Sequence, residues 1–229
     1  VYISFSSLSK FFGPTLEVAE QILLQPLFPE DELRAYCEKR KQTLTIERRK
    51  VDTVVREIFA EALFGDKHPY GISYPEKDYD TLTRADLESL YRRLYTAENC
   101  LVVCSGRIGE EELQGIGALA EKLPRADRSA TADFPAPRSE AYRFVERPDA
   151  VQSSLRVGRL LFTRTHPDFV GMQVVATVLG GYFGSRLMQN LRGEHGYTYG
   201  VGAAMVNFER EGYCLLYTSD AADDLTRVD

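Results

Sequence analysis

The chain has 229 residues, of which 44% are hydrophobic and 27% charged, and its formal net charge at pH 7 is −6. This composition is typical of a soluble globular protein with room for one large or two modest domains. Its acidic balance, without interleaved basic and aromatic residues, argues against nucleic-acid binding, and no apolar run approaches the ~20 residues of a membrane-spanning helix.

Strand and helix patterns alternate along the first 123 residues. The expected helices, in chain order, cover residues 16–23, 29 to about 50, 55–63, 84–94 after an N-cap at Thr83, and 111–123. A strand is expected at residues 1–6, and a buried strand at residues 101–106, which read Leu-Val-Val-Cys-Ser-Gly.

Residues 124–140 have the small, polar and proline-rich composition of a linker, which divides the chain into two halves. The second half is expected to open with a strand near residues 152–158. A short helix after Ser185 and a strand at 197–203 follow, and further strand pairing reaches to about Thr218. The four cysteines lack Cys-x-x-Cys spacing and are expected to be small buried core residues, which favours a reducing compartment.

Arg192 and Tyr199 stand seven residues apart across the expected helix-to-strand joint. Leu187, Met188 and Leu191 form the apolar side of the helix, so Arg192 falls in its last turn, and Tyr199 can face back toward it from the strand. A guanidinium and a phenol both donate hydrogen bonds, which suits them to holding a peptide carbonyl or the oxyanion formed from it. The alternative is structural: a helix-terminal arginine and a half-buried strand aromatic.

Residues 180–203, GGYFGSRLMQNLRGEHGYTYGVGA, resemble the C-terminal-half signature of the insulinase-like (M16, pitrilysin-type) zinc peptidases and their non-catalytic partner subunits. Three further stretches resemble landmarks of the same family in the same order: residues 63–71, 95–100 and 152–158. The resemblance spans roughly residues 1–213. It is specific, because four landmarks occur in sequence.

The resemblance implies an α+β fold made of two halves, each an antiparallel sheet packed with helices and each incomplete here. Residues 1–123 would be the C-terminal part of the first half, residues 141–218 the beginning of the second, and residues 219–229 a tail that does not match the family. It also implies that Arg192 and Tyr199 bind substrate across a cavity from a metal. The chain begins with Val1, in a pattern already typical of a strand, so it is expected to be a fragment.

The family binds zinc through a His-x-x-Glu-His helix and a later glutamate, and this chain has no such motif. His68, His166 and His195 are far apart in the sequence and are expected to be turn or surface residues. Glu47 falls near the place of the family's third zinc ligand. Its Arg-Arg-Lys neighbourhood is unlike the acidic context of catalytic members, so it is expected to be a solvated helix residue.

Three hypotheses follow for the function. The chain is a metal-free subunit that positions peptide substrate for a homologous zinc-bearing partner; or a zinc metallopeptidase whose metal helix lies upstream; or a structural subunit that binds no peptide. No metal or other cofactor is expected on these residues, and zinc is expected on the partner or upstream. Whether the protein acts in the cytoplasm or the periplasm stays open, because a signal peptide would lie upstream.

Overall fold

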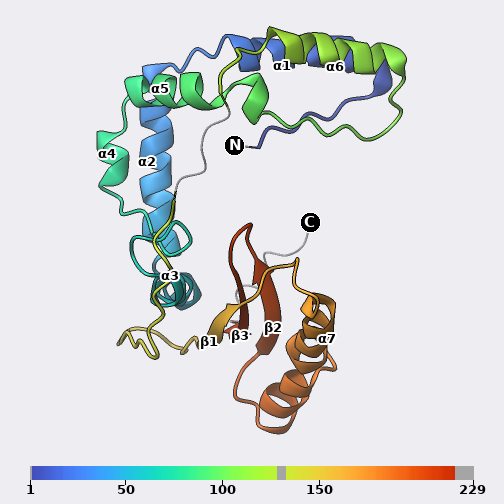
Figure 1. Ribbon diagram of the computed structural model, residues 1–229. Coiled ribbons are helices and arrows are strands. Elements are labelled where there is room, and N and C mark those ends of the chain that lie inside the picture. The colour runs from blue at the N-terminus through green and yellow to red at the C-terminus, as the bar shows by residue number, and fades with distance from the viewer. Residues whose placement is uncertain (1, 128–132, 220–229) are drawn as a thin grey trace. The chain divides into compact units, whose positions relative to one another are not determined.

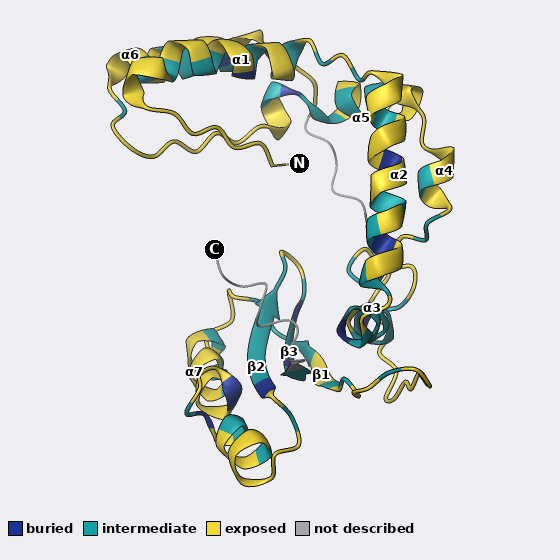
Figure 2. Cartoon of the chain, turned by 180° about the vertical axis from the view of Figure 1, so that it is seen from behind, coloured by how far each residue is buried: buried dark blue, intermediate teal, exposed yellow. Residues whose placement is uncertain are grey.

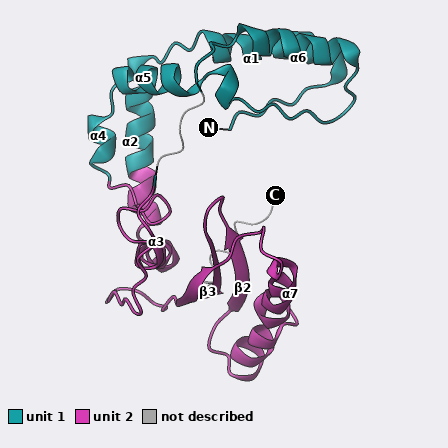
Figure 3. Ribbon diagram, in the orientation of Figure 1, with its two compact units in different colours: residues 1–41, 76–133 teal, residues 42–75, 134–229 magenta. Residues whose placement is uncertain are grey.

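The computed structural model describes residues 2–127 and 133–219 (Figure 1). It combines helices with an antiparallel sheet, which confirms the α+β class expected from the sequence. The chain folds into two compact units, Val1–Lys41 with Glu76–Asp133 and Gln42–Pro75 with Phe134–Asp229 (Figure 3). The boundary between the units falls inside helix α2 (Glu30–Glu47).

The first unit is helical. Its elements are η1 (Ser9–Phe11), α1 (Phe12–Leu24), most of α2, α4 (Asp78–Thr81), α5 (Arg84–Leu94), η2 (Ala97–Asn99) and α6 (Glu110–Lys122). Helices α1 and α6 lie side by side (Figure 1), and the Lys122 ammonium lies 2.7 Å from the Glu20 carboxylate across their contact. The Tyr91 hydroxyl donates to the Leu23 carbonyl at 2.6 Å, which fixes α5 against the end of α1.

Local capping explains where α5 begins, as the sequence predicted. The Thr83 backbone N–H donates to the Asp86 carboxylate at 2.9 Å, and the Asp86 N–H donates to the Thr83 hydroxyl at 3.2 Å. This reciprocal pair satisfies two N–H groups that a helix start leaves without partners. Hydrogen bonds from the Thr83 side chain and backbone hold the pKa of Asp86 below its ordinary value.

The second unit contains the sheet. Strands β1 (Arg156–Leu161), β3 (Gly212–Ser219) and β2 (Gly200–Asn207) lie in that order and pair antiparallel. In the register, Leu160 stands opposite Tyr213 and Ala203 stands opposite Leu216. Helix α7 (Phe169–Gly180) packs on β2, and helix α3 (Val51–Phe64) contacts β1. Figure 2 shows that the sheet is more buried than α7, whose outer face is exposed.

An aromatic cluster forms the core between α3 and the hairpin of β2 and β3. Phe64 is 2% exposed and stacks on His68 with ring centroids 5.1 Å apart, while Tyr70 stacks on Phe208 at 4.0 Å. The His68 Nδ1 accepts the Tyr70 backbone N–H at 3.2 Å within the turn that follows α3. Helix α3 ends at Gly65, whose φ of 91° favours glycine.

Two expected strands are absent from the described residues, and these predictions are wrong. Residues 2–6 and residues 101–106 form no strand, and Leu101 and Val103 are 87% and 83% exposed. A strand is stable only when neighbouring strands take up its backbone hydrogen bonds, and no described strand pairs with either segment. An apolar run alone therefore does not decide the conformation.

The expectation that all four cysteines are buried is also wrong. Cys37 is buried in α2 and Cys214 is half-buried in β3, but Cys100 and Cys104 are exposed because their segment has no sheet to enter. All four thiols are free.

Among the described residues, none of the helices combines the length and the apolar character that crossing a bilayer requires.

Candidate functional site

Arg192 lies in the last turn of the π-helical segment η3 (Met188–Glu194), as the sequence predicted. The segment follows Ser185, whose carbonyl accepts the Gln189 N–H at 2.9 Å. Leu187 stands at the N-cap of η3, and the buried Ser185 hydroxyl has no hydrogen-bond partner among the described residues, so the expected capping by Ser185 is wrong. Gly196, with a φ of 63°, then turns the chain toward β2.

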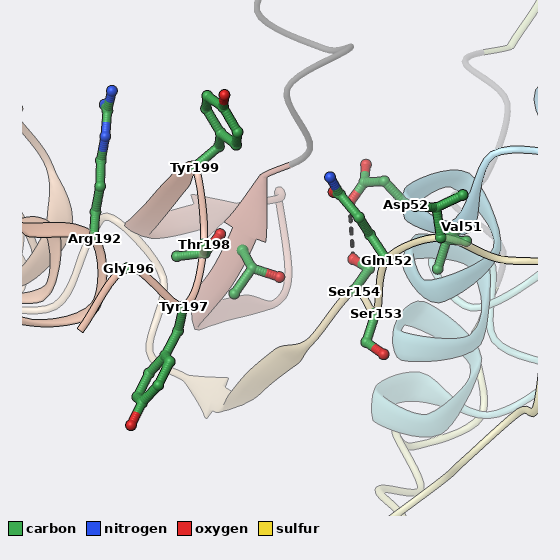
Figure 4. A pocket seen from close by; sticks show the side chains of 12 residues that line it. Val51, Asp52, Gln152, Ser153, Ser154, Arg192, Gly196, Tyr197, Thr198 and Tyr199 are labelled. Carbon is green, nitrogen blue, oxygen red and sulfur yellow. Dashed lines mark hydrogen bonds between the residues drawn. The ribbon is translucent and has the colours of Figure 1, made fainter.

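Tyr199 comes directly before β2, which begins at Gly200, three residues later than the predicted strand. The side chains of Arg192 and Tyr199 point to the same side, and Tyr197 points to the opposite side (Figure 4). Arg192 and Tyr199 are both exposed, and the Arg192 guanidinium lies over the Phe183 ring at 5.1 Å. The Val201 N–H donates to the Met188 sulfur at 3.4 Å, so the two sides of the joint are connected.

Both residues line one open hollow of about 570 Å³ in the second unit, here called the Arg–Tyr hollow. Its walls come from the start of α3 at residues 51–52, the segment 151–154 before β1, the joint at 192 and 196–199, and Thr218 of β3. In Figure 4, Gln152, Ser153 and Ser154 lie beside the start of α3, and the joint that carries Arg192 and Tyr199 lies across from them. The hollow is large enough for part of a peptide chain.

Asp52 is the one carboxylate among the described residues of this lining, and sequence reasoning missed it. Its carboxylate accepts from Arg56 at 2.6 Å, from Arg156 of β1 at 3.0 Å and from the Ser154 hydroxyl at 3.4 Å. Burial acts to raise the pKa of Asp52, but the hydrogen bonds and charges of Arg56 and Arg156 outweigh it and hold that pKa below its ordinary value.

The two ion pairs of Asp52 differ in whether the sequence could have indicated them. The pair of Asp52 and Arg56 has the i,i+4 spacing that can be found in a helical sequence. Arg156 lies 104 residues from Asp52, a separation that no local pattern bridges. The network joins α3 to β1 and thereby fixes one wall of the Arg–Tyr hollow.

The three histidines lie in separate local structures. His68 is buried in the turn after α3, His166 is exposed in a turn where its Nδ1 accepts the Asp168 N–H at 3.2 Å, and His195 stacks on Tyr197 at 5.0 Å. Glu47 ends α2 and is half-buried. In residues 2–127 and 133–219, no three histidine, cysteine, aspartate or glutamate side chains are grouped so that they could hold a metal ion.

Comparison with known proteins decides the family. The model of the family described as "Peptidase M16 inactive domain" matches residues 81–228, more than half of the chain. The chain belongs to the M16 peptidase family. The resemblance stated from residues 63–71, 95–100, 152–158 and 180–203 is thus confirmed.

Relatives and solved structures agree with this assignment. The M16 chain is 29% identical over 177 residues to an "uncharacterized zinc protease" of Mycobacterium bovis, covering 73% of this chain and 40% of that protein. It is 26% identical over 227 residues to an "uncharacterized zinc protease" of Rickettsia bellii, covering 95% of this chain and 53% of that protein. It thus spans about half, or less, of the length of these relatives.

The fold is that of the solved M16 inactive domains. The crystal structure of such a domain from Pseudomonas fluorescens superposes with a TM-score of 0.83 at 24% identity, over 93% of this chain and 52% of that one. At this identity the likeness supports the fold alone.

Proposed function

We propose that this M16 segment is metal-free and positions peptide substrate for hydrolysis at the zinc of a homologous partner. Arg192 and Tyr199 are the substrate-binding residues in this proposal. The observation that carries it is that both line one hollow and direct their side chains to the same side (Figure 4). We also propose that the linker of residues 124–140 divides the chain into two halves.

The chemistry of the two side chains supports this role. A guanidinium has five N–H donors and no acceptor, and a phenol adds an O–H donor, so together they favour an oxygen that bears negative charge. The Arg192 guanidinium lies 5.1 Å from the centroid of the Phe183 ring, an attractive contact that uses none of its N–H donors. Donors held in advance stabilise a carbonyl oxygen as it becomes an oxyanion.

This chain then contributes orientation, and the partner's zinc supplies the activation of water. Holding a peptide backbone in one geometry lowers the entropic part of the barrier, even when the reacting groups belong to another chain. The described residues of the hollow offer one carboxylate and no imidazole, a donor set unlike the nitrogen and sulfur ligands of zinc sites. No step of hydrolysis is assigned to them.

A second candidate is that the same segment belongs to a longer chain with its own zinc site. The matched part of this chain covers only 40% and 53% of the two relatives named zinc proteases, which favours this candidate. Arg192 and Tyr199 keep the same substrate-binding role in that case. The two candidates differ only in whether the zinc and the Arg–Tyr hollow lie on one polypeptide.

Reconstitution tests the proposal. The 229-residue chain is mixed with a zinc-bearing M16 subunit, and cleavage of an internally quenched peptide is followed with each component alone and together. We expect cleavage in the mixture well above the sum of the components. An assembled mixture that is no faster than the zinc-bearing subunit alone would leave the structural-subunit hypothesis in place.

A further inference from the structure

The Arg–Tyr hollow carries a surplus of positive charge, although the whole chain has a net charge of −6. Its one described carboxylate, Asp52, is already bound by two guanidiniums, those of Arg56 and Arg156. Asp52 is also largely shielded from solvent, since its side chain is 10% exposed. The single negative charge of Asp52 is thus outnumbered by the positive charges of Arg56 and Arg156, even without Arg192.

Arg192 adds a third guanidinium, and no carboxylate of the described residues forms an ion pair with it. Its described contact is with the Phe183 ring, and the neighbouring Glu194 carboxylate accepts instead from the Asn190 amide at 2.9 Å. A cation over an aromatic ring is attracted by the ring without using its N–H donors, so the Arg192 N–H groups stay available to a ligand. Arg192 is therefore held in position with its charge uncompensated.

The neutral groups of the hollow include further donors. The Tyr199 hydroxyl is free in the described structure and its side chain is exposed, and the Ser153 hydroxyl has no described partner. Thr218 accepts the Leu155 N–H at 3.1 Å, so its own O–H remains able to donate. Hydroxyl donors beside a guanidinium are the partners that a carboxylate takes in proteins.

We propose that the Arg–Tyr hollow selects peptides that place a carboxylate next to the bound backbone, supplied either by a C-terminal group or by an acidic side chain. This proposal rests on the proposed function and deepens it by naming the substrate class. Arg192 supplies the charged fork, Tyr199 and the hydroxyls supply neutral donors, and the Arg56 and Arg156 surplus keeps the local potential positive. An uncharged or basic peptide gains nothing from that surplus.

The test measures binding of four labelled peptides to the 229-residue chain by fluorescence anisotropy. The peptides share one sequence and differ in a single internal Glu or Gln and in a free or amidated C-terminus, so the two carboxylate sources are separated. We expect one carboxylate source to bind about fivefold more tightly than its amide twin, which is the upper end of the scale for an exposed charge pair. The preference should shrink between low and 0.5 M salt.

A matched pair of variants attributes the preference to the hollow. Arg56→Gln removes one positive charge beside Asp52 at a side chain that is 63% exposed, and Arg164→Gln removes the same charge from an exposed turn that does not line the hollow. Arg56→Gln should reduce the preference several-fold, while Arg164→Gln should leave it unchanged. Equal effects of the two variants would overturn the local assignment.

The remaining outcomes separate this inference from the proposed function. If all four peptides bind with the same affinity at low salt, the carboxylate preference is wrong and peptide binding stands. If none of them binds, both proposals fail together. The acidic net charge of the chain disfavours acidic peptides in general, so a preference for them identifies a local site.

Discussion

Tyr199 differs from Tyr197 by one property that matters for the proposed function, which is the side to which the ring points (Figure 4). Tyr199→Phe removes one hydroxyl donor and keeps the aromatic ring. In the reconstituted complex we expect turnover to fall on the order of a hundredfold, the usual effect of losing one oxyanion donor. The thermal melt should stay unchanged, because the ring is 65% exposed and its packing is retained.

Tyr197→Phe is the matched control. It makes the same chemical change at a ring that is 75% exposed and directed away from Arg192, so turnover should remain at the wild-type level. Wild-type turnover in Tyr199→Phe, in a complex shown to be assembled, would contradict the substrate-binding role. Equal losses in both variants would point to a general effect of the joint on folding.

Asp52 is expected to make the second unit sensitive to acid. Its pKa is lowered in the folded state, so the stability it contributes is present above its unfolded pKa of about 3.9 and is lost as pH falls through the lower folded value. Asp52→Asn should cost roughly 2–4 kcal/mol at pH 7, because it leaves Arg156, whose side chain is only 11% exposed, without its carboxylate. Urea unfolding at pH 7 and pH 3 measures both effects.

Arg56→Gln is the control for this network. Arg56 is 63% exposed, so losing its ion pair should cost less than about 1 kcal/mol while Asp52 keeps Arg156. Asp86 and Glu98 of the first unit also have lowered pKa values, so part of the stability that the wild-type protein loses in acid comes from these two residues and not from Asp52. If the free energy of unfolding of Asp52→Asn depends on pH as that of the wild type does, Asp52 is not a source of the acid sensitivity.

At the level of elements, the contact between α7 and β2 depends on a glycine. A methyl group at Gly180 would lie 2.5 Å from the Ala203 nitrogen and 2.8 Å from its Cβ, so helix and strand would have to separate. We expect Gly180→Ala to destabilise the second unit by about 1–3 kcal/mol, the usual cost of overpacking. Chemical unfolding followed by circular dichroism measures it.

Gly171→Ala supplies the comparison on the same helix. No atom lies within 4 Å of a methyl group built there, so the substitution adds only helix propensity and should stabilise α7 by up to about 1 kcal/mol. Opposite signs for the two variants would show that close packing at the C-terminal end of α7 limits stability. A loss of equal size in both would refute the packing explanation.

Helices with local signals could be predicted from the sequence, whereas elements that depend on distant partners could not. The Thr83 N-cap and the spacing of Leu87, Leu90 and Leu94 give α5 within the chain itself. Residues 101–106 have the apolar composition of a strand, but strand formation depends on neighbours that no local pattern reports. Helix α7 was missed because it is apolar along most of its length and shows no amphipathic period.

The candidate site was likewise predictable only where local sequence signals exist. Arg192 could be placed in the last turn of its helix because Gly193 and Gly196 signal a nearby helix end, and the helix does end at Glu194. The strand after it begins three residues later than alternation suggests, because the Tyr197 N–H donates to the Leu191 carbonyl of the helical segment at 2.9 Å and not to a neighbouring strand. The Asp52 network was not predictable, because a pairing across 104 residues depends on tertiary structure.

At the level of the whole molecule, the proposed division of labour predicts that the 229-residue chain holds little zinc by itself. Its histidines are engaged locally: the Nδ1 atoms of His68 and His166 each accept a backbone N–H, and His195 stacks on Tyr197. After incubation with zinc and dialysis, metal analysis should find far less than one zinc per chain, and the chain alone should not cleave peptide. A zinc-bearing M16 subunit treated in parallel is the positive control. About one tightly held zinc per chain, with chelator-sensitive hydrolysis by the chain alone, would contradict the division of labour and favour a peptidase that needs no partner.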